Sequence, residues 1–308
     1  MKVAIQDNEV LKTINPAKVV TYLKSNGWQQ EIIDNDRVSV FIQRIDSGKE
    51  LVIELPLKPE FRDFSRRMSE VIKTLEDAEQ RSQLEIFTDI RTSWADVIRL
   101  RVHHPNLVDG SIPLEDSIRI QEYALNMILS AASSTIKPQT YFQEKMAKAV
   151  DYTRQLRIGQ TEESNAYILT IISPLSIDKT HSNGEISPIL PEPFERQVLK
   201  QLVSALETSR IAAENVASTG SLDAFIGTEQ NGISANFCEA MVGINENSGN
   251  SGVEIALSWS PLLAMLDNVP DKVILPANYM PIIKQIGENF RANWQKEFGG
   301  KQAAVNSH

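Results

Sequence analysis

The sequence predicts an α+β fold, in which a small αββα N-terminal unit at residues 1–90 precedes a larger mixed α/β domain at residues 91–308. The 308 residues are 42% hydrophobic and 23% charged, a composition typical of globular chains with one or two domains. Apolar residues alternate in several short runs and recur at helical spacing in longer ones. We therefore expect about half helix, with helices flanking the central sheet of the larger domain.

The N-terminal unit is predicted from a helix, a hairpin and a second helix. Asn15-Pro16 and Asn26-Gly27 mark the start and end of a helix over 17–25. Two alternating runs flank a turn at 46–48 and indicate a β-hairpin. Helical spacing of apolar residues then predicts a helix over 61–78. The alternating residues are Val38, Val40 and Ile42 in one run and Leu51, Ile53 and Leu55 in the other.

The larger domain begins with a predicted strand at 97–103 and contains further strands and helices in mixed order. Pro113 starts a helix whose apolar side we assign to Ile118, Leu125, Ile128, Leu129 and Ala132. Its end, Ser130 to Ser134, offers small side chains that permit close approach of a neighbour. The remaining elements are helices at 141–156, 194–217, 234–242 and 278–298, strands at 166–172, 253–259 and 273–275, an exposed loop at 173–193 and a polar loop at 245–252.

Composition narrows the class of protein. The formal charge of −9 disfavours broad contact with nucleic acid. A single cysteine, Cys238, excludes an intramolecular disulfide and suits a reducing compartment, and its apolar helical neighbours predict a buried, inert thiol. The first residues turn polar too early for a signal peptide, and no apolar stretch is long enough for a bilayer. We expect a cytoplasmic protein with no membrane contact.

The run Ile98-Arg99-Leu100-Arg101-Val102-His103-His104-Pro105 is the first candidate for chemistry. Side chains alternate along a strand, so Arg99, Arg101 and His103 share one face and His104 projects from the other. The two histidines therefore cannot bind one metal ion unless Pro105 ends the strand early and releases His104. The shared face forms either an anion-binding row, with His103 as acid or base, or the solvated face of an edge strand.

A second candidate is the turn that follows the helix at 141–156. Arg154 and Arg157 share a helical face there, and Gly159, Gln160 and Glu162 follow. If this turn meets the strand at 97–103, a phosphorylated ligand would bind, with Glu162 or His103 as base. The competing interpretation is a helix end whose arginines complement the helix dipole. The combined ligand-binding set is Arg99, Arg101, His103, Arg157, Gln160 and Glu162.

The sequence contains no paired-cysteine zinc motif, no His-Glu-x-x-His and no Gly-x-Ser-x-Gly. It also lacks a kinase or Walker signature and a Gly-x-Gly-x-x-Gly motif after a strand. We predict no catalytic residue, no metal and no cofactor, and we assign the chain to no family. The first hypothesis is a non-catalytic cytosolic assembly protein that binds itself or a protein partner, as an accessory subunit of a bacterial complex, for example one in antiviral defence. The bacterial and defence assignments rest on no particular residue.

Two alternatives come from other classes. One is an enzyme or sensor that binds a phosphorylated small molecule at the basic middle segment. The other is a nucleic-acid-binding protein that uses Arg62, Arg66 and Arg67 together with residues 91–157. Interleaved acidic residues offset the charge of those arginines and weaken this last hypothesis.

Overall fold

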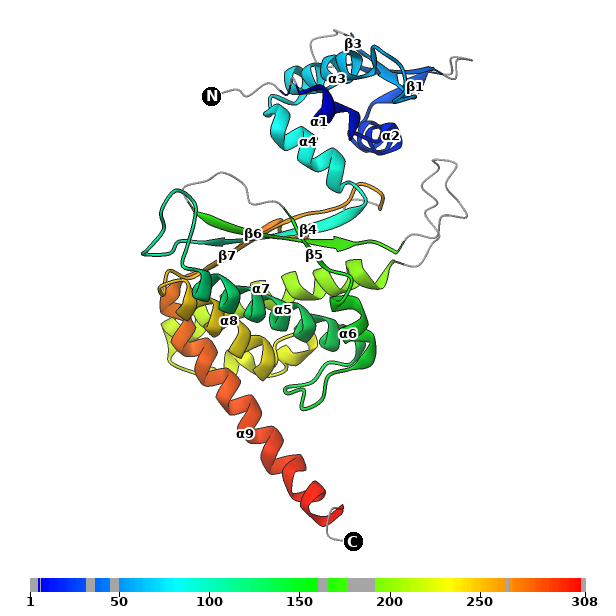
Figure 1. Cartoon of the computed structure of the whole chain (residues 1–308). Helices are drawn as coiled ribbons and strands as arrows, with labels where there is room; N and C mark the ends of the chain where they lie inside the picture. Colours follow the sequence, from blue (N-terminus) through cyan, green and yellow to red (C-terminus); the bar gives the residue numbers. More distant parts are fainter. Residues whose placement is uncertain are drawn as a thin grey trace. The chain divides into compact units, whose positions relative to one another are not determined.

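The computed structural model describes residues 5, 7–31, 37–44, 50–159, 166–176, 192–263, 266 and 268–305, with the backbone alone for 298–305 (Figure 1). Helix makes up 54% and strand 18% of the chain, which confirms the predicted α+β class and the expectation of about half helix. The chain divides into two compact units. The first contains Met1–Ala95 and Trp259–Met265, and the second contains most of the rest, from Asp96 onward.

The first unit packs four helices on one face of an antiparallel three-stranded sheet of order β1-β2-β3. The helix starts are capped, since Asn15 accepts a hydrogen bond from the Ala17 amide and Ser82 forms a capping box with Glu85. The elements are α1 (Asn8–Lys12), α2 (Pro16–Ser25), β1 (Gln29–Glu31), β2 (Val38–Arg44), β3 (Glu50–Pro56), α3 (Phe64–Glu79) and α4 (Gln83–Thr92).

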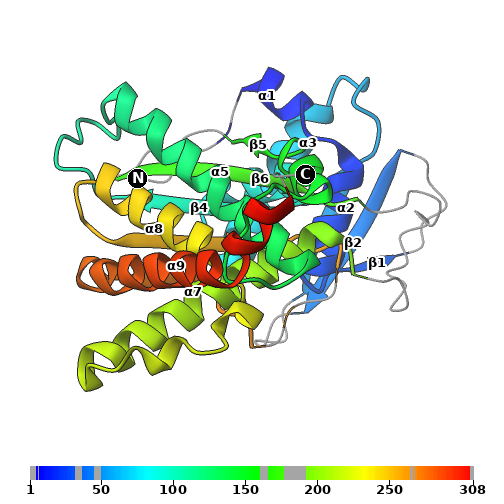
Figure 2. The same ribbon diagram turned by 90° about the horizontal axis from the view of Figure 1, so that it is seen from below.

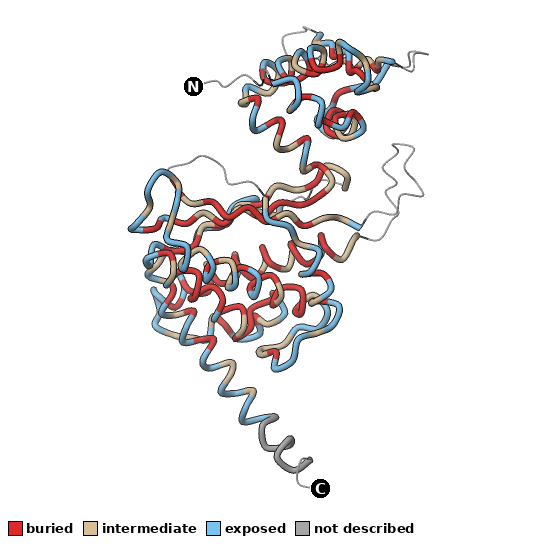
Figure 3. The backbone as a smooth tube through the Cα atoms, in the orientation of Figure 1, coloured by how far each residue is buried: buried red, intermediate tan, exposed pale blue. Residues whose placement is uncertain are grey.

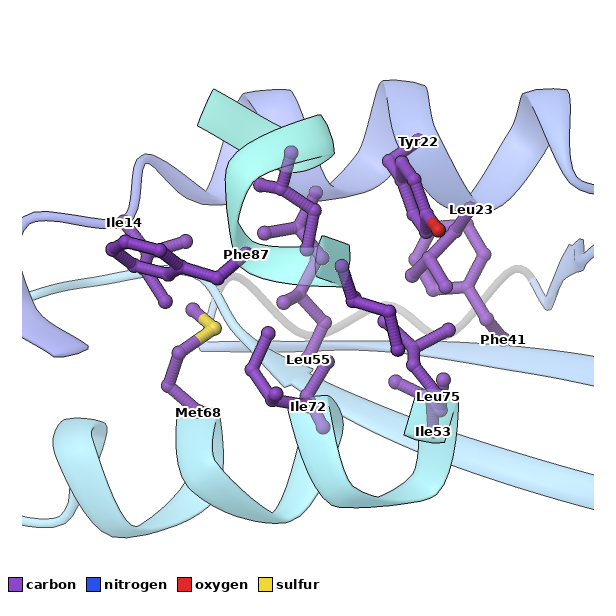
Figure 4. Close-up of a cluster of buried hydrophobic side chains, with 14 of the residues drawn as sticks. Ile14, Tyr22, Leu23, Phe41, Ile53, Leu55, Met68, Ile72, Leu75 and Phe87 are labelled. Carbon is purple, nitrogen blue, oxygen red and sulfur yellow. The ribbon is translucent and has the colours of Figure 1, made fainter. Parts of the chain in front are cut away.

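The core of this unit lies between its sheet and its helices (Figure 4). Phe41 of β2 pairs with Ile53 of β3, and both side chains are buried with Leu55. Val40 instead pairs with Glu54, so the Val38, Val40 and Ile42 set lies on the outer face of the sheet. Alternation had identified the strands, but the pairing register determines which face of each strand enters the core.

The second unit contains a five-stranded sheet of order β5-β6-β4-β7-β8. Helices α5, α7, α8 and α9 lie on one side of this sheet (Figure 1). The elements are β4 (Ala95–Val102), α5 (Leu114–Ile136), α6 (Ala147–Thr153), β5 (Arg157–Ile158), β6 (Tyr167–Pro174), α7 (Phe194–Thr219), η2 (Leu222–Phe225), η3 (Thr228–Asn231), α8 (Ala235–Asn247), β7 (Val253–Ser258), β8 (Lys272–Leu275), η4 (Ala277–Tyr279) and α9 (Met280–Val305).

The helices of this unit form one packed layer. Helix α8 packs against both α5 and α9, and Figure 2 shows the layer from the helix side. A methyl group on Gly287 of α9 would lie 2.8 Å from Cβ of Cys238 on α8, so only glycine allows this close approach. Buried residues fill the space between sheet and helices, whereas residues 292–297 of α9 are largely exposed (Figure 3).

Several elements differ from those expected from the sequence, and α1, β1, α4 and β5 were not predicted. The helix predicted over 141–156 is only α6, because backbone groups before it bond to α8 instead: the Ala235 amide donates to the Thr140 carbonyl at 2.7 Å. Helix α8 runs to Asn247, beyond its predicted end, and the Asn245 side chain then bonds to Asn250 and the Gly252 amide. Most of the predicted exposed loop, residues 177–191, lies outside the described residues.

Candidate functional site

The predicted anion-binding row lies on the face of β4 that points away from the helices. Arg99 pairs in register with Ala256 and Arg101 with Glu254 of β7. The Arg99 guanidinium donates to Ser258 Oγ at 2.6 Å. Arg101 Nε lies 3.3 Å from Glu254 Oε1. The row therefore has polar partners on the neighbouring strand.

Glu254 is the centre of this charged cluster. Lys272 Nζ on β8 lies 2.7 Å from Glu254 Oε1, and His103 Nε2 lies 3.9 Å from Oε2. One carboxylate thus contacts Arg101, Lys272 and His103. An anionic ligand at this face would compete with Glu254 for the same basic groups, which weakens the case for a preformed anion site.

Arg157 lies in the edge strand β5, and β6 separates that strand from β4. Its guanidinium is directed at the carbonyls of Arg154 and Leu156, at 3.4 and 3.3 Å. Gln160 and Glu162 lie outside the described residues. The structure thus places Arg99, Arg101 and His103 together and Arg157 two strands away, and the six-residue ligand site stays a hypothesis.

His104 has a structural position in the loop after β4. Its side chain is buried, and Nδ1 accepts a hydrogen bond from the Asn106 amide at 3.1 Å. Nε2 therefore carries the proton and lies 3.1 Å from Asp116 Oδ2 on α5. With both ring nitrogens engaged, His104 fixes the loop to α5. Over the described residues, the chain contains no cluster of three or more metal-binding side chains.

A buried polar cluster lies at one end of the sheet and was not predicted from the sequence. Arg196 of α7 donates from Nε and Nη2 to the two carboxylate oxygens of Asp96, at 2.8 Å each, and both side chains are fully buried. Next to them the Tyr152 and Ser173 hydroxyls lie 2.9 Å apart. Burial, followed by the nearby carboxylates of Asp96 and Glu195, raises the pKa of Tyr152 above its usual value.

Asp96 carried a signal in the sequence. It lies in the same alternation as Ile98 and Leu100, so a charged residue occupies the apolar face of the strand. Such a residue requires a buried partner, but nothing in the sequence points to Arg196, one hundred positions later. The geometry is that of a structural ion pair, because Asp96 and Arg196 are inaccessible to solvent.

Helix α5 presents an apolar stripe to solvent. Leu114, Ile118, Leu125 and Ile136 are 76%, 49%, 45% and 40% exposed. At 3.6 residues per turn these four residues fall within about 40° of one another around the helix axis. We call Leu114, Ile118 and Leu125 the α5 stripe, because the buried residues Ser130 to Ser134 separate Ile136 from them. Half-buried Leu129 lies on its edge. Aligned exposed apolar residues of this kind mark interaction surfaces more often than scattered ones do.

The core side of α5 differs from the one assigned from the sequence. Of the residues expected in the core, Ile128 and Ala132 are buried, whereas Ile118 and Leu125 are exposed. The other buried residues of this side are Ile120, Ala124, Met127 and Ala131. The small residues Ser130 to Ser134 are also buried, and Ser130 Oγ lies 2.7 Å from Ser234 Oγ at the start of α8. The neighbour that approaches these small residues is therefore α8 of the same chain.

Two of the three arginines assigned to nucleic-acid binding, Arg66 and Arg67, have acidic neighbours. Arg66 pairs with Glu70 at 3.2 Å, and Arg67 pairs with Asp63 at 2.6 Å and with Glu54 at 3.4 Å. These contacts offset the positive charge on α3 and leave little potential for a polyanion.

Cys238 is buried, and burial raises the pKa of its thiol to about 12. We expect it to react with a thiol-specific reagent only after unfolding. A rise from 9 to about 12 lowers the thiolate fraction near neutral pH by about a thousandfold. Absorbance from Ellman's reagent, in buffer and in denaturant, measures this difference. Rapid labelling of the folded chain would contradict the buried position.

Comparison with protein-family models, curated proteins and solved structures finds no match to this chain. Among the described helices, none has the length and hydropathy needed to cross a bilayer.

Proposed function

We propose that this chain is a non-catalytic assembly protein that pairs with a second copy of itself through the α5 stripe. The observation that carries the proposal is the alignment of three exposed apolar side chains, Leu114, Ile118 and Leu125, over the first half of one long helix. In a monomer this surface would stay in contact with water, at a cost of about 25 cal/mol for each Å² of apolar area.

The spacing along α5 supports self-pairing. Leu114, Ile118, Gln121 and Leu125 follow one another at intervals of four, three and four residues, a pattern that reads the same in both directions. Two antiparallel α5 helices related by a twofold axis therefore bring Leu114 of one copy against Leu125 of the other. Such isologous contacts are the commonest basis of homodimers.

The cellular setting is part of the same proposal. A single buried cysteine suits the cytoplasm. Membership of a larger bacterial complex, including one in antiviral defence, is a further hypothesis.

Light scattering after size-exclusion chromatography, over a range of protein concentrations, tests the pairing. The monomer mass is 34.5 kDa, and we expect the measured mass to rise toward twice that value as concentration increases. A mass of one chain at every concentration would overturn the proposal.

The second candidate function is binding of a phosphorylated small molecule at the Glu254 cluster. Its support is that Arg99, Arg101 and His103 lie together along one strand face; an anion bound there must displace Glu254 from Arg101 and His103. A rise in melting temperature with pyrophosphate that is lost in Arg99→Ala and Arg101→Ala variants would favour this candidate over assembly. An unchanged melting temperature with pyrophosphate would rule out this candidate function.

A further inference from the structure

Two acidic residues lie beside the α5 stripe on the solvent side of helix α5. Glu115 and Glu122 are both exposed, and the Glu115 side chain is 77% accessible to water. At 3.6 residues per turn the two lie within about 20° of each other around the helix axis and about 70° from the centre of the stripe. They therefore border the stripe along one side, and we call them the acidic flank.

The other side of the stripe faces the rest of the chain. Ala124 is buried there, and the Ser117 hydroxyl lies 2.9 Å from the Tyr167 hydroxyl of β6. The two borders of the stripe thus differ, since one packs within the chain and the other is charged and exposed. A second copy that covers the stripe approaches the acidic flank on its solvent side.

The acidic flank is only partly neutralised within one chain. Arg119 lies one helical turn from both carboxylates and forms an ion pair with Glu115, in which Nη2 lies 2.6 Å from Oε1. Glu122 forms no ion pair among the residues that the structure describes. Two carboxylates and one guanidinium leave a net charge of −1, which is carried mainly by Glu122.

Twofold pairing through the stripe brings the two acidic flanks together. A twofold axis that places Leu114 against Leu125 of the second copy keeps both flanks on the same side of the helix pair. Position 122 of one helix then lies beside position 117 of the other, so Glu122 is about 3 Å along the axis from Glu115 of the second copy. Symmetry makes this contact twice, and residues that border a helix pair influence which partner and which orientation are favoured.

We propose that the acidic flank regulates pairing through the α5 stripe, so that pairing is weaker at low ionic strength and strengthens when salt screens the carboxylates. This regulation rests on the proposed function, because it acts only where two α5 helices meet. Exposed charges are screened efficiently, since the Debye length falls from about 30 Å at 0.01 M salt to about 3 Å at 1 M. Glu122 opposes pairing most, because Arg119 offsets the charge of Glu115.

Sedimentation equilibrium of the full chain in about 0.05 M and about 0.5 M sodium chloride tests the proposal, with Glu122→Arg as the variant. Wild type should associate about two- to fivefold more tightly at the higher salt concentration, as two relieved like-charge contacts allow. Glu122→Arg turns each repulsion into an attraction to Glu115 of the second copy. It should therefore associate about five- to twentyfold more tightly than wild type at low salt and lose the strengthening by salt.

The control is Glu297→Arg, which makes the same charge change at an exposed position of α9. It should keep the salt response of the wild type, which separates the acidic flank from general repulsion between acidic chains. Circular dichroism confirms that each variant is folded. Pairing of equal strength in Glu122→Arg and Glu297→Arg would overturn the role of the acidic flank and leave the pairing intact. Monomers at both salt concentrations, in wild type and Glu122→Arg alike, would overturn the pairing itself.

Discussion

Substitution of Asp96 by alanine is expected to lower the free energy of unfolding by about 3–5 kcal/mol, the usual cost of removing one partner of a buried ion pair. Asp96 and Arg196 are both fully buried, and two hydrogen bonds of 2.8 Å join them. The variant leaves the guanidinium in an apolar interior without its carboxylate. Urea denaturation followed by circular dichroism measures the change.

A surface ion pair provides the matched control. Arg210 and Glu207 lie 2.6 Å apart on α7, and each side chain is about a third exposed. Glu207→Ala should lower the free energy of unfolding by less than about 1 kcal/mol, because water replaces the lost partner. If Asp96→Ala lowered the free energy of unfolding as little as Glu207→Ala, the interior position of the ion pair would be incorrect.

The sequence predicted the elements whose side-chain pattern is long and regular. Strand β7 alternates Val253, Ile255 and Leu257 with more polar residues, and the structure buries those three residues. Helices α7 and α9 were likewise found from apolar residues at helical spacing. In these elements local periodicity and burial agree, so no knowledge of distant contacts is needed.

Helix α5 shows where periodicity is not sufficient. Its sequence holds two apolar stripes, one with Ile120, Ala124 and Met127 and one with Ile118 and Leu125. Either could face the core on pattern alone. Packing against α7 and α8 determines the choice, and that contact joins segments far apart in the chain. The exposed stripe became recognisable only after the buried one was known.

The candidate sites show the same limit, because the sequence predicts which residues share a strand face but not which residues pair with them. Alternation placed Arg99, Arg101 and His103 on one face of a strand. The carboxylate that pairs with Arg101 and His103, Glu254, comes from a strand about 150 residues later, and sequence gives no register between such strands. The same holds for Asp96 and Arg196, because the sequence around either residue does not predict which residue pairs with it.

The central claim is that the α5 stripe holds two copies of the chain together, and Ile118 is its most informative position. Ile118→Glu puts a charge in the middle of the proposed contact. A twofold interface contains each residue twice, and each isoleucine contributes about 1.5–3 kcal/mol when it is buried. Association should therefore weaken by at least about a hundredfold.

Ile211 provides a control of the same residue type. It is 47% exposed on α7, against 49% for Ile118, and its neighbours one helical turn away are Glu207, Thr208, Glu214 and Asn215. Ile211→Glu thus makes the same chemical change on a surface that has no apolar stripe.

Sedimentation equilibrium of the wild type, Ile118→Glu and Ile211→Glu is the most direct measurement. Wild type and Ile211→Glu should show the same equilibrium between 34.5 kDa and twice that mass, and Ile118→Glu should stay at 34.5 kDa over the same concentrations. Equal association of all three proteins, or equal loss in both variants, would contradict pairing through the α5 stripe.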